Sequence, residues 1–149
     1  MDKIDYKLRE ARKSDNDIIY ELLEELRGDV KIHYNDFKSY FDYILDTNSG
    51  IILLAVHEEE VVGLATFSRL PILRYAGWYY IFEELVIHQE YRRKGAVFFL
   101  LKEMLSYLRQ DKEAIKVLTI YDGEMQNLLY GRYFDNVQRY VSQKFLNPK

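Results

Sequence analysis

A short basic turn is the part of the sequence best suited to binding a charged ligand. It spans residues 91–96 and contains Arg92, Arg93, Lys94 and Gly95, between an apolar β-like run and an apolar helical run. The first turn of a helix leaves backbone N–H groups unpaired, and the helix dipole favours negative charge there. Glycine lets a ligand approach the backbone, and arginine and lysine supply charged donors for phosphate oxygens. We therefore expect this turn to bind phosphate, although a solvated basic turn is an equally good reading of these residues alone.

Two adjacent carboxylates, Glu83 and Glu84, precede this turn near the end of the β-like run, and Glu83 lies nine residues before Arg92. Side chains alternate along a strand, so the two glutamates are expected on opposite faces of a sheet. A carboxylate at this place can act as a general base. A solvent-facing strand residue is an equally good reading of Glu83 and the better reading of Glu84.

Several familiar catalytic and nucleotide-binding patterns are absent from the sequence. There is no GxxxxGK[ST] loop and no GxGxxG pattern, so neither a P-loop nor a dinucleotide site is expected. His33, His57 and His88 have no HExxH-like spacing to carboxylates and the chain has no cysteine, so we expect no metal site. The GxSxG motif of serine hydrolases is also missing.

Length, composition and charge favour one domain over residues 1–149. The chain is 48% hydrophobic and 15% aromatic, which is enough for a sizeable core. Its formal net charge of −3 argues against nonspecific nucleic-acid binding, which needs a basic surface. The first residues do not resemble a signal peptide, and no apolar run is long enough to span a membrane. We expect a cytoplasmic protein that binds neither membranes nor nucleic acid.

The hydrophobic pattern predicts the elements that must position these residues. Their order is strand, two helices, three strands, helix, strand, helix and strand, which describes a mixed α/β domain with antiparallel hairpins and a later βαβ crossover. Ser14 is the expected N-cap of the first helix, Gly28 its end, and residues 69–77 a loop. Strands are expected over residues 5–11, 51–57, 61–67, 78–88, 115–120 and 137–145, and the later helices around 37–45, 97–108 and 124–133.

The segment over residues 83–96 resembles the central motif of the GCN5-related N-acetyltransferases, the GNAT superfamily. In that family an Arg/Gln-x-x-Gly-x-Gly/Ala turn binds the pyrophosphate of coenzyme A through backbone amides. Arg92 and Gly95 fill its first two fixed positions, and Val97 stands at the third, where a small residue is usual and a branched one could restrict cofactor approach. The order of elements also matches. The resemblance therefore implies a GNAT-like acyl-CoA N-acyltransferase fold, a central mixed β-sheet flanked by helices.

The same resemblance implies acetyl-CoA as the co-substrate. Its pantetheine arm would lie between two splayed strands, the one ending near His88 and the one over residues 115–120. Leu85 and Ile87 are also expected to alternate onto one face and pack in the core. The implied cofactor-binding residues are Leu85, Val86 and Ile87 for the pantetheine arm, and Arg92, Arg93, Lys94, Gly95, Ala96 and Val97 for the pyrophosphate.

For catalysis, the resemblance implies that Glu83 serves as the base, directly or through water. In polyamine-type members of the family an acidic pair precedes the same hydrophobic triplet. Deprotonating a lysine-like amine at pH 7 costs about 4–5 kcal/mol, which a base helps to supply. The family's usual acid is a tyrosine before the last strand; Tyr130 is the first choice here and Tyr133 the alternative. Because the chain has 14 tyrosines and lacks the family's Gly-Phe pair, an alternative interpretation is that Tyr130 and Tyr133 only pack against neighbouring side chains.

We therefore expect an acetyltransferase that moves acetyl from acetyl-CoA to a primary amine of a small molecule or peptide by direct transfer. Val97 and the incomplete tyrosine motif motivate the alternative, a catalytically impaired acyl-CoA-binding sensor or interaction module. The sequence leaves the acceptor open, since in this fold acceptor choice lies around the first two helices and residues 69–77. The tyrosine-rich surface and the last strand are also compatible with a homodimer.

Overall fold

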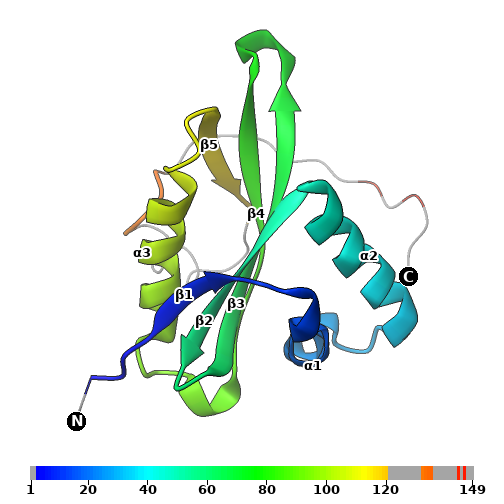
Figure 1. Cartoon of the computed structure of the whole chain (residues 1–149), viewed down its shortest axis with the longest axis vertical. Helices are drawn as coiled ribbons and strands as arrows, with labels where there is room; N and C mark the ends of the chain where they lie inside the picture. Colours follow the sequence, from blue (N-terminus) through cyan, green and yellow to red (C-terminus); the bar gives the residue numbers. More distant parts are fainter. Residues whose placement is uncertain (1–2, 121–131, 136–143, 145, 147–149) are drawn as a thin grey trace.

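The structure is a computed structural model that describes residues 3–120, 132–135, 144 and 146 (Figure 1). Within them five strands form one sheet in the order β1-β2-β3-β4-β5. Strands β1 to β4 are antiparallel neighbours and β5 joins β4 in parallel, which confirms the mixed sheet and the βαβ crossover. The elements are β1 (Lys7–Glu10), α1 (Asn16–Arg27), α2 (Tyr34–Thr47), β2 (Gly50–His57), β3 (Glu60–Ile72), β4 (Gly77–Ile87), α3 (Ala96–Leu108) and β5 (Ala114–Thr119), with short 3-10 helices at Lys13–Asp15, Leu73–Tyr75 and Gln89–Tyr91.

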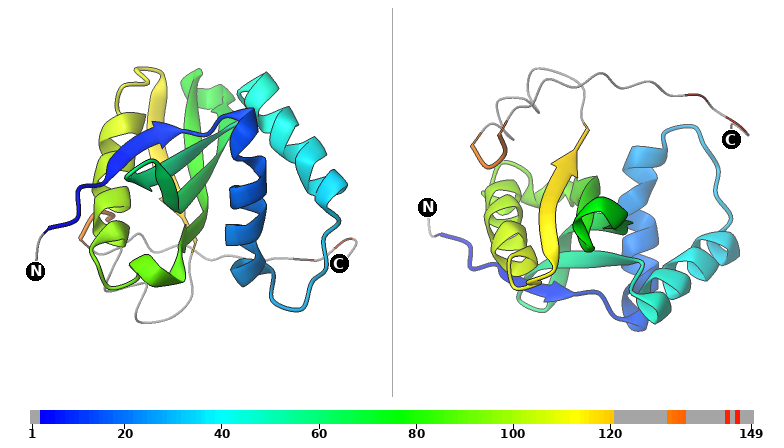
Figure 2. Two further views of the ribbon diagram at one scale, coloured as in Figure 1. Left: turned by 60° about the horizontal axis from the view of Figure 1, so that its bottom comes forward. Right: turned by 90° about the horizontal axis from the view of Figure 1, so that it is seen from above.

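Helices cover both faces of the sheet: α1 and α2 lie on one face and α3 on the other (Figure 2). Val86 packs with side chains of α1 and α2, whereas Leu85 and Ile87 pack on the α3 face. This confirms the expected alternation of the apolar triplet. The buried residues of the α3 face include Phe67, Tyr80, Phe82, Leu101 and Met104, and those of the other face include Ile19, Leu22, Phe41, Leu64 and Val86.

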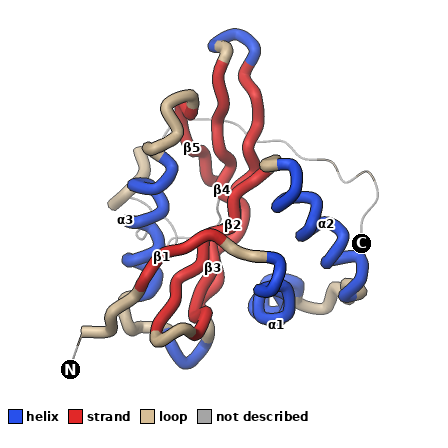
Figure 3. The backbone as a smooth tube through the Cα atoms, in the orientation of Figure 1, coloured by secondary structure: helices blue, strands red, loops and turns tan. Residues whose placement is uncertain are grey.

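The β3–β4 hairpin is longer than the sequence indicates, so the expected loop over residues 69–77 is wrong. β3 continues to Ile72, and β4 begins at Gly77 after a single 3-10 turn. The two strands extend past the rest of the sheet as a projecting arm (Figure 3). Pro71 is tolerated there because the pairing of β2 with β3 ends at Ser68, and proline is accepted where one side of a strand has no partner.

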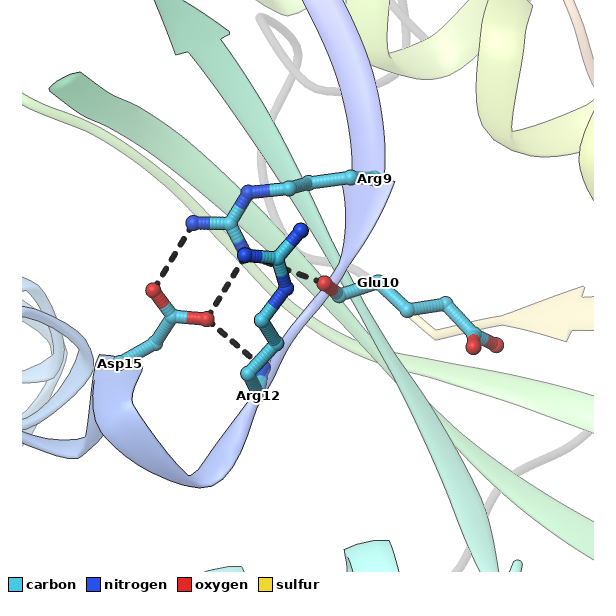
Figure 4. A network of polar contacts seen from close by, with 4 residues as sticks. All are labelled: Arg9, Glu10, Arg12 and Asp15. Atoms are coloured by element: carbon cyan, nitrogen blue, oxygen red, sulfur yellow. Dashed lines mark hydrogen bonds and ion pairs between the residues drawn. The ribbon is translucent and has the colours of Figure 1, made fainter. Parts of the chain in front are cut away.

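The start of α1 depends on Asp15 rather than on Ser14, so the expected N-cap is wrong. Asp15 Oδ2 accepts a hydrogen bond from the Arg12 backbone N–H at 2.7 Å, and the Arg9 guanidinium donates to both carboxylate oxygens at 2.8 and 2.9 Å (Figure 4). Arg9 belongs to β1, so this contact joins the edge strand to the first helix. The hydrogen bonds from Arg9 hold the pKa of Asp15 below its usual value, against the opposing effect of burial.

We expect Asp15→Asn to lower the free energy of unfolding by about 1–3 kcal/mol at pH 7, because charge-assisted hydrogen bonds are lost at a nearly buried position. A carboxyl whose pKa is lowered by folding stabilises the protein above its unfolded-state pKa, and this contribution is lost as the pH falls through the folded-state pKa. The difference between variant and wild type, measured by urea denaturation, should therefore shrink below about pH 4.

The matched control is Asp46→Asn, which removes an ion pair with Lys13 in which both side chains are 58% exposed. Exposed pairs contribute little to stability, so this variant should resemble wild type at every pH. Equal losses for the two variants, or a loss for Asp15→Asn that does not change with pH, would contradict the assigned role of Asp15.

Candidate active site

The second half of β4 has a strand partner on one side only. β5 pairs with β4 from Trp78 to Phe82, whereas β3 pairs with β4 as far as Ile87. The edge of residues 83–87 that faces away from β3 therefore has no partner strand within the described part of the chain (Figure 1). Such an edge offers backbone N–H and C=O groups to an extended ligand. Leu85, Val86 and Ile87 lie on this edge.

A polar network holds β5 against the first half of β4. The Tyr80 hydroxyl donates a hydrogen bond to Asp111 Oδ2 at 2.7 Å, and the Arg69 guanidinium approaches the same oxygen at 3.4 Å. Arg69 also stacks over the Trp78 ring, 4.0 Å from its centroid. Burial, followed by the hydrogen bond to Asp111, raises the pKa of Tyr80 to about 12. Because Asp111 lies three residues before the start of β5 at Ala114, these contacts fix the paired end of the two strands.

A β-bulge at Glu83 places both glutamates on the same face of the sheet. Thr66 of β3 pairs with Glu84 and the next β3 residue pairs with Phe82, so Glu83 is an extra residue on β4. The Thr66 hydroxyl donates to Glu84 Oε1 at 2.8 Å, and the Ser68 hydroxyl donates to Glu83 Oε1 at 3.1 Å. The expectation of opposite faces is wrong because the bulge interrupts the alternation of side chains.

These two carboxylates line a cavity of about 410 Å³ between the sheet and helices α1 and α2. The sheet contributes its polar side chains Thr66, Ser68, Glu83 and Glu84, and the other charged lining residues are Arg27 and Asp36. The remaining lining residues are apolar or aromatic, namely Ile19, Leu23, Leu26, Ile32, Phe37, Tyr40, Phe41, Ile44, Ile52 and Phe67. No sequence pattern predicts this cavity directly; the alternating Thr66 and Ser68 in an apolar strand are the one signal that indicates a polar face.

The basic turn has the strand–turn–helix geometry expected from the sequence. Arg93 and Gly95 have left-handed φ values of 59° and 84°, and α3 begins at Ala96. No described residue accepts a hydrogen bond from the N–H groups of Arg93, Lys94 or Gly95. The Tyr6 hydroxyl donates to the Lys94 carbonyl at 2.9 Å and so fixes the turn to the N-terminal segment. The turn and the first turn of α3 can therefore present unpaired N–H groups to an anion.

The Arg92 side chain is exposed, but protein groups engage its guanidinium. It forms an ion pair with Glu25 of α1, and its Nε donates to the Ile87 carbonyl at 3.2 Å. The Arg93 and Lys94 side chains are exposed. Sequence reasoning missed Glu25, because a glutamate on the polar side of a helix carries no pattern that indicates a distant partner.

Val97 is half-buried and packs against the apolar clusters on the α3 face of the sheet. Ala96 is 1% exposed at the same helix start. The branched side chain at the third motif position thus fills space between α3 and the sheet. Its effect on cofactor binding stays a prediction.

The remaining expected site residues are placed as follows. Tyr130 lies outside the described residues, and Tyr133 is half-buried against the cluster that contains Phe82. His88 Nδ1 accepts a hydrogen bond from the Glu90 N–H at 3.2 Å, which caps the short helix before the basic turn. The described residues include no cluster of histidine and acidic side chains that could hold a metal ion. None of the described helices is long and apolar enough to cross a membrane.

Comparison with known proteins agrees with this geometry. Residues 16–130 match the acetyltransferase (GNAT) family, and the chain belongs to this family. No curated protein matches the chain in sequence.

Solved structures show the same fold at low sequence identity. Glucosamine-6-phosphate N-acetyltransferase from Arabidopsis thaliana superposes with a TM-score of 0.76 and 17% identity over 96% of this chain and 99% of that one. A predicted acetyltransferase from Clostridium acetobutylicum, solved with acetyl-CoA, superposes with a TM-score of 0.74 and 13% identity over 94% of this chain and 96% of that one. Ribosomal-protein-alanine N-acetyltransferase from Brucella melitensis biovar Abortus 2308 superposes with a TM-score of 0.73 and 16% identity over 95% of this chain and 100% of that one. At these identities the likeness establishes the fold alone.

The left-handed conformation at Gly95 yields a stability prediction. Gly95→Ala should lower the free energy of unfolding by about 1–2 kcal/mol, because a Cβ is unfavourable at positive φ. An added Cβ meets no atom within 4 Å at Gly95, so strain rather than collision causes the loss. Gly28→Ala is the comparison variant, since Gly28 also has a positive φ of 58° and open surroundings, with a ψ of −124° in place of the −1° of Gly95. Thermal or urea denaturation should show a loss for both variants, and an unchanged Gly95→Ala would contradict the assigned turn conformation.

Proposed function

We propose that the protein transfers an acetyl group from acetyl-CoA to a primary amine by direct attack of the amine on the thioester. One observation carries the proposal. Along β4, an open strand edge lies between a cavity that contains two carboxylates and a helix start with unpaired N–H groups. Membership of the GNAT acetyltransferase family supports the same reaction.

Acetyl-CoA fits the groups that β4 and α3 present. The N–H groups of residues 93–97 and the exposed Arg93 and Lys94 side chains suit a pyrophosphate. The open edge at Leu85, Val86 and Ile87 suits the amide-containing pantetheine arm, which can pair with it as a strand would. The presence of acetyl-CoA in the Clostridium acetobutylicum neighbour supports this choice of co-substrate.

In the proposed reaction Glu83 receives, directly or through water, the proton that a protonated amine must lose before it attacks. Ser68 donates to Glu83 and so orients its carboxylate, and Glu84 beside it adds negative charge that favours an ammonium group. A C–N bond then forms and the C–S bond breaks. Tyr130, or Tyr133 in its place, donates a proton to the sulfur of coenzyme A and is reprotonated by one of the two protons that the nitrogen loses. The other proton leaves to solvent through Glu83.

Glu83→Gln should lower kcat for acetyl transfer by about 100-fold, since general base catalysis contributes roughly 10²–10⁴-fold. Release of free coenzyme A thiol over a panel of amines measures this rate. Glu59→Gln, in the exposed β2–β3 turn, is the control and should resemble wild type. Turnover by Glu83→Gln at the wild-type rate would remove Glu83 from the mechanism. The absence of turnover with any amine would refute the reaction itself.

Gly95→Ala should weaken coenzyme A binding by about tenfold, because the turn must present its N–H groups in one conformation. Gly28→Ala also places a Cβ at a positive φ, but outside the turn, and should bind as wild type does. Calorimetric titration with coenzyme A measures both affinities. No binding by the wild-type protein would contradict the cofactor assignment, whereas tight binding without turnover would favour the acyl-CoA sensor over the enzyme.

A further inference from the structure

We infer that the acceptor is a small arylalkylamine, a primary amine joined by a short linker to one aromatic ring. The inference rests on the proposed function, because it assigns the substrate class of the same site. It follows from the distribution of charge and apolar surface in the cavity beside Glu83 and Glu84.

The cavity separates its carboxylates from its apolar walls. The two carboxylates come from neighbouring residues of β4, and each is oriented by one hydroxyl of β3. The helices α1 and α2 contribute mainly aliphatic and aromatic side chains. A ligand that is complementary to this arrangement has one cationic end and one apolar body.

Aromatic rings form a continuous wall on α2. Phe37 and Phe41, which both line the cavity, are stacked with their ring centroids 5.7 Å apart, and Tyr20 of α1 packs against Phe37 at 5.2 Å without lining the cavity. Tyr40 also lines the cavity although it is 69% exposed, so it borders both cavity and solvent. Aromatic rings favour offset or edge-to-face contacts with another ring, which gives an aromatic ligand an advantage beyond the area it buries.

The remaining charges disfavour ligands with an anionic group. Arg27 and Asp36 are the other charged residues that line the cavity, and they have opposite signs. The Arg27 guanidinium lies 4.3 Å from the centroid of the Tyr20 ring and donates to the Tyr20 carbonyl at 3.0 Å. It is therefore already engaged and is poorly placed to bind a phosphate. A long polyamine would find one further lining carboxylate, Asp36, and would place its remaining ammonium groups against apolar walls.

The size of the cavity also limits the acceptor. Its volume of about 410 Å³ lies near the lower end of the range of roughly 300–1,000 Å³ that is usual for small-molecule pockets. A single ring with a short aminoalkyl chain fits this range better than a large ligand.

An acceptor panel tests the inference with the full chain and acetyl-CoA. The amines are 2-phenylethylamine, ethylamine, spermidine and glucosamine 6-phosphate, and release of coenzyme A thiol is the signal. We expect kcat/KM for 2-phenylethylamine to exceed that for ethylamine by about 30-fold, the effect of burying one aromatic ring. Spermidine and glucosamine 6-phosphate should be poorer than 2-phenylethylamine.

Two exposed tyrosines of α2 provide matched variants. Tyr40 lines the cavity, whereas Tyr43, which is 58% exposed, does not. Tyr40→Ala should reduce the preference for 2-phenylethylamine over ethylamine by about fivefold, mainly through KM, and Tyr43→Ala should leave this ratio as in wild type. Because both side chains are largely exposed, neither change should prevent folding.

The outcomes separate this inference from the proposed function. A preference for ethylamine, spermidine or the phosphosugar, or equal effects of the two tyrosine variants, would overturn the arylalkylamine class while leaving acetyl transfer intact. No thiol release with any amine would instead refute the proposed function and this inference with it. Binding of 2-phenylethylamine without turnover would also refute both, because the bound amine would not be an acceptor.

Discussion

β4 has strand partners on both sides in its first half and on one side in its second half, and the arrangement of the candidate site depends on this difference. The network of Tyr80, Asp111 and Arg69 holds β5 to the paired end. These contacts hold β5 only beside the first half of β4, so the β4 backbone beyond Phe82 is open on one edge of the described sheet. An extended cofactor arm needs such an edge, and a fully paired central strand would not offer one.

The bulge at Glu83 adds a second consequence on the same strand. In a regular strand one of the two neighbouring glutamates would face α3 and the apolar cluster around Phe82. The extra residue turns Glu84 back toward Thr66, so both carboxylates face the α1 and α2 side. The hydroxyls of Thr66 and Ser68 each donate a hydrogen bond to one of these carboxylates, and so orient the half-buried Glu84 and the exposed Glu83. The proposed acceptor chemistry and the sheet register are thus linked.

The ion pair between Arg92 and Glu25 joins the basic turn to α1. Helix α1 also supplies Leu23 and Leu26 to the cavity wall. One helix therefore contacts both the turn proposed for the pyrophosphate and the cavity proposed for the amine. The first residue of the family motif contributes to this tertiary contact. The backbone N–H groups of Arg93, Lys94 and Gly95, which no described residue uses, are the groups left for a ligand.

The sequence by itself determined the order of the elements as far as β5, the strand–turn–helix around the basic turn, the alternation of Leu85, Val86 and Ile87, and the family to which the chain belongs. These features follow from local periodicity and from glycine at a left-handed position, and both depend only on residues that are near one another in the sequence. The expected last helix and last strand lie almost wholly outside the described residues. Only the tertiary structure decided the length of the β3–β4 hairpin and the position of the α1 N-cap at Asp15 and not at Ser14. It also decided the shared face of Glu83 and Glu84 and the pairing of Arg92 with Glu25. Each of these depends on strand register or on a partner distant in sequence, for which a local pattern contains no information.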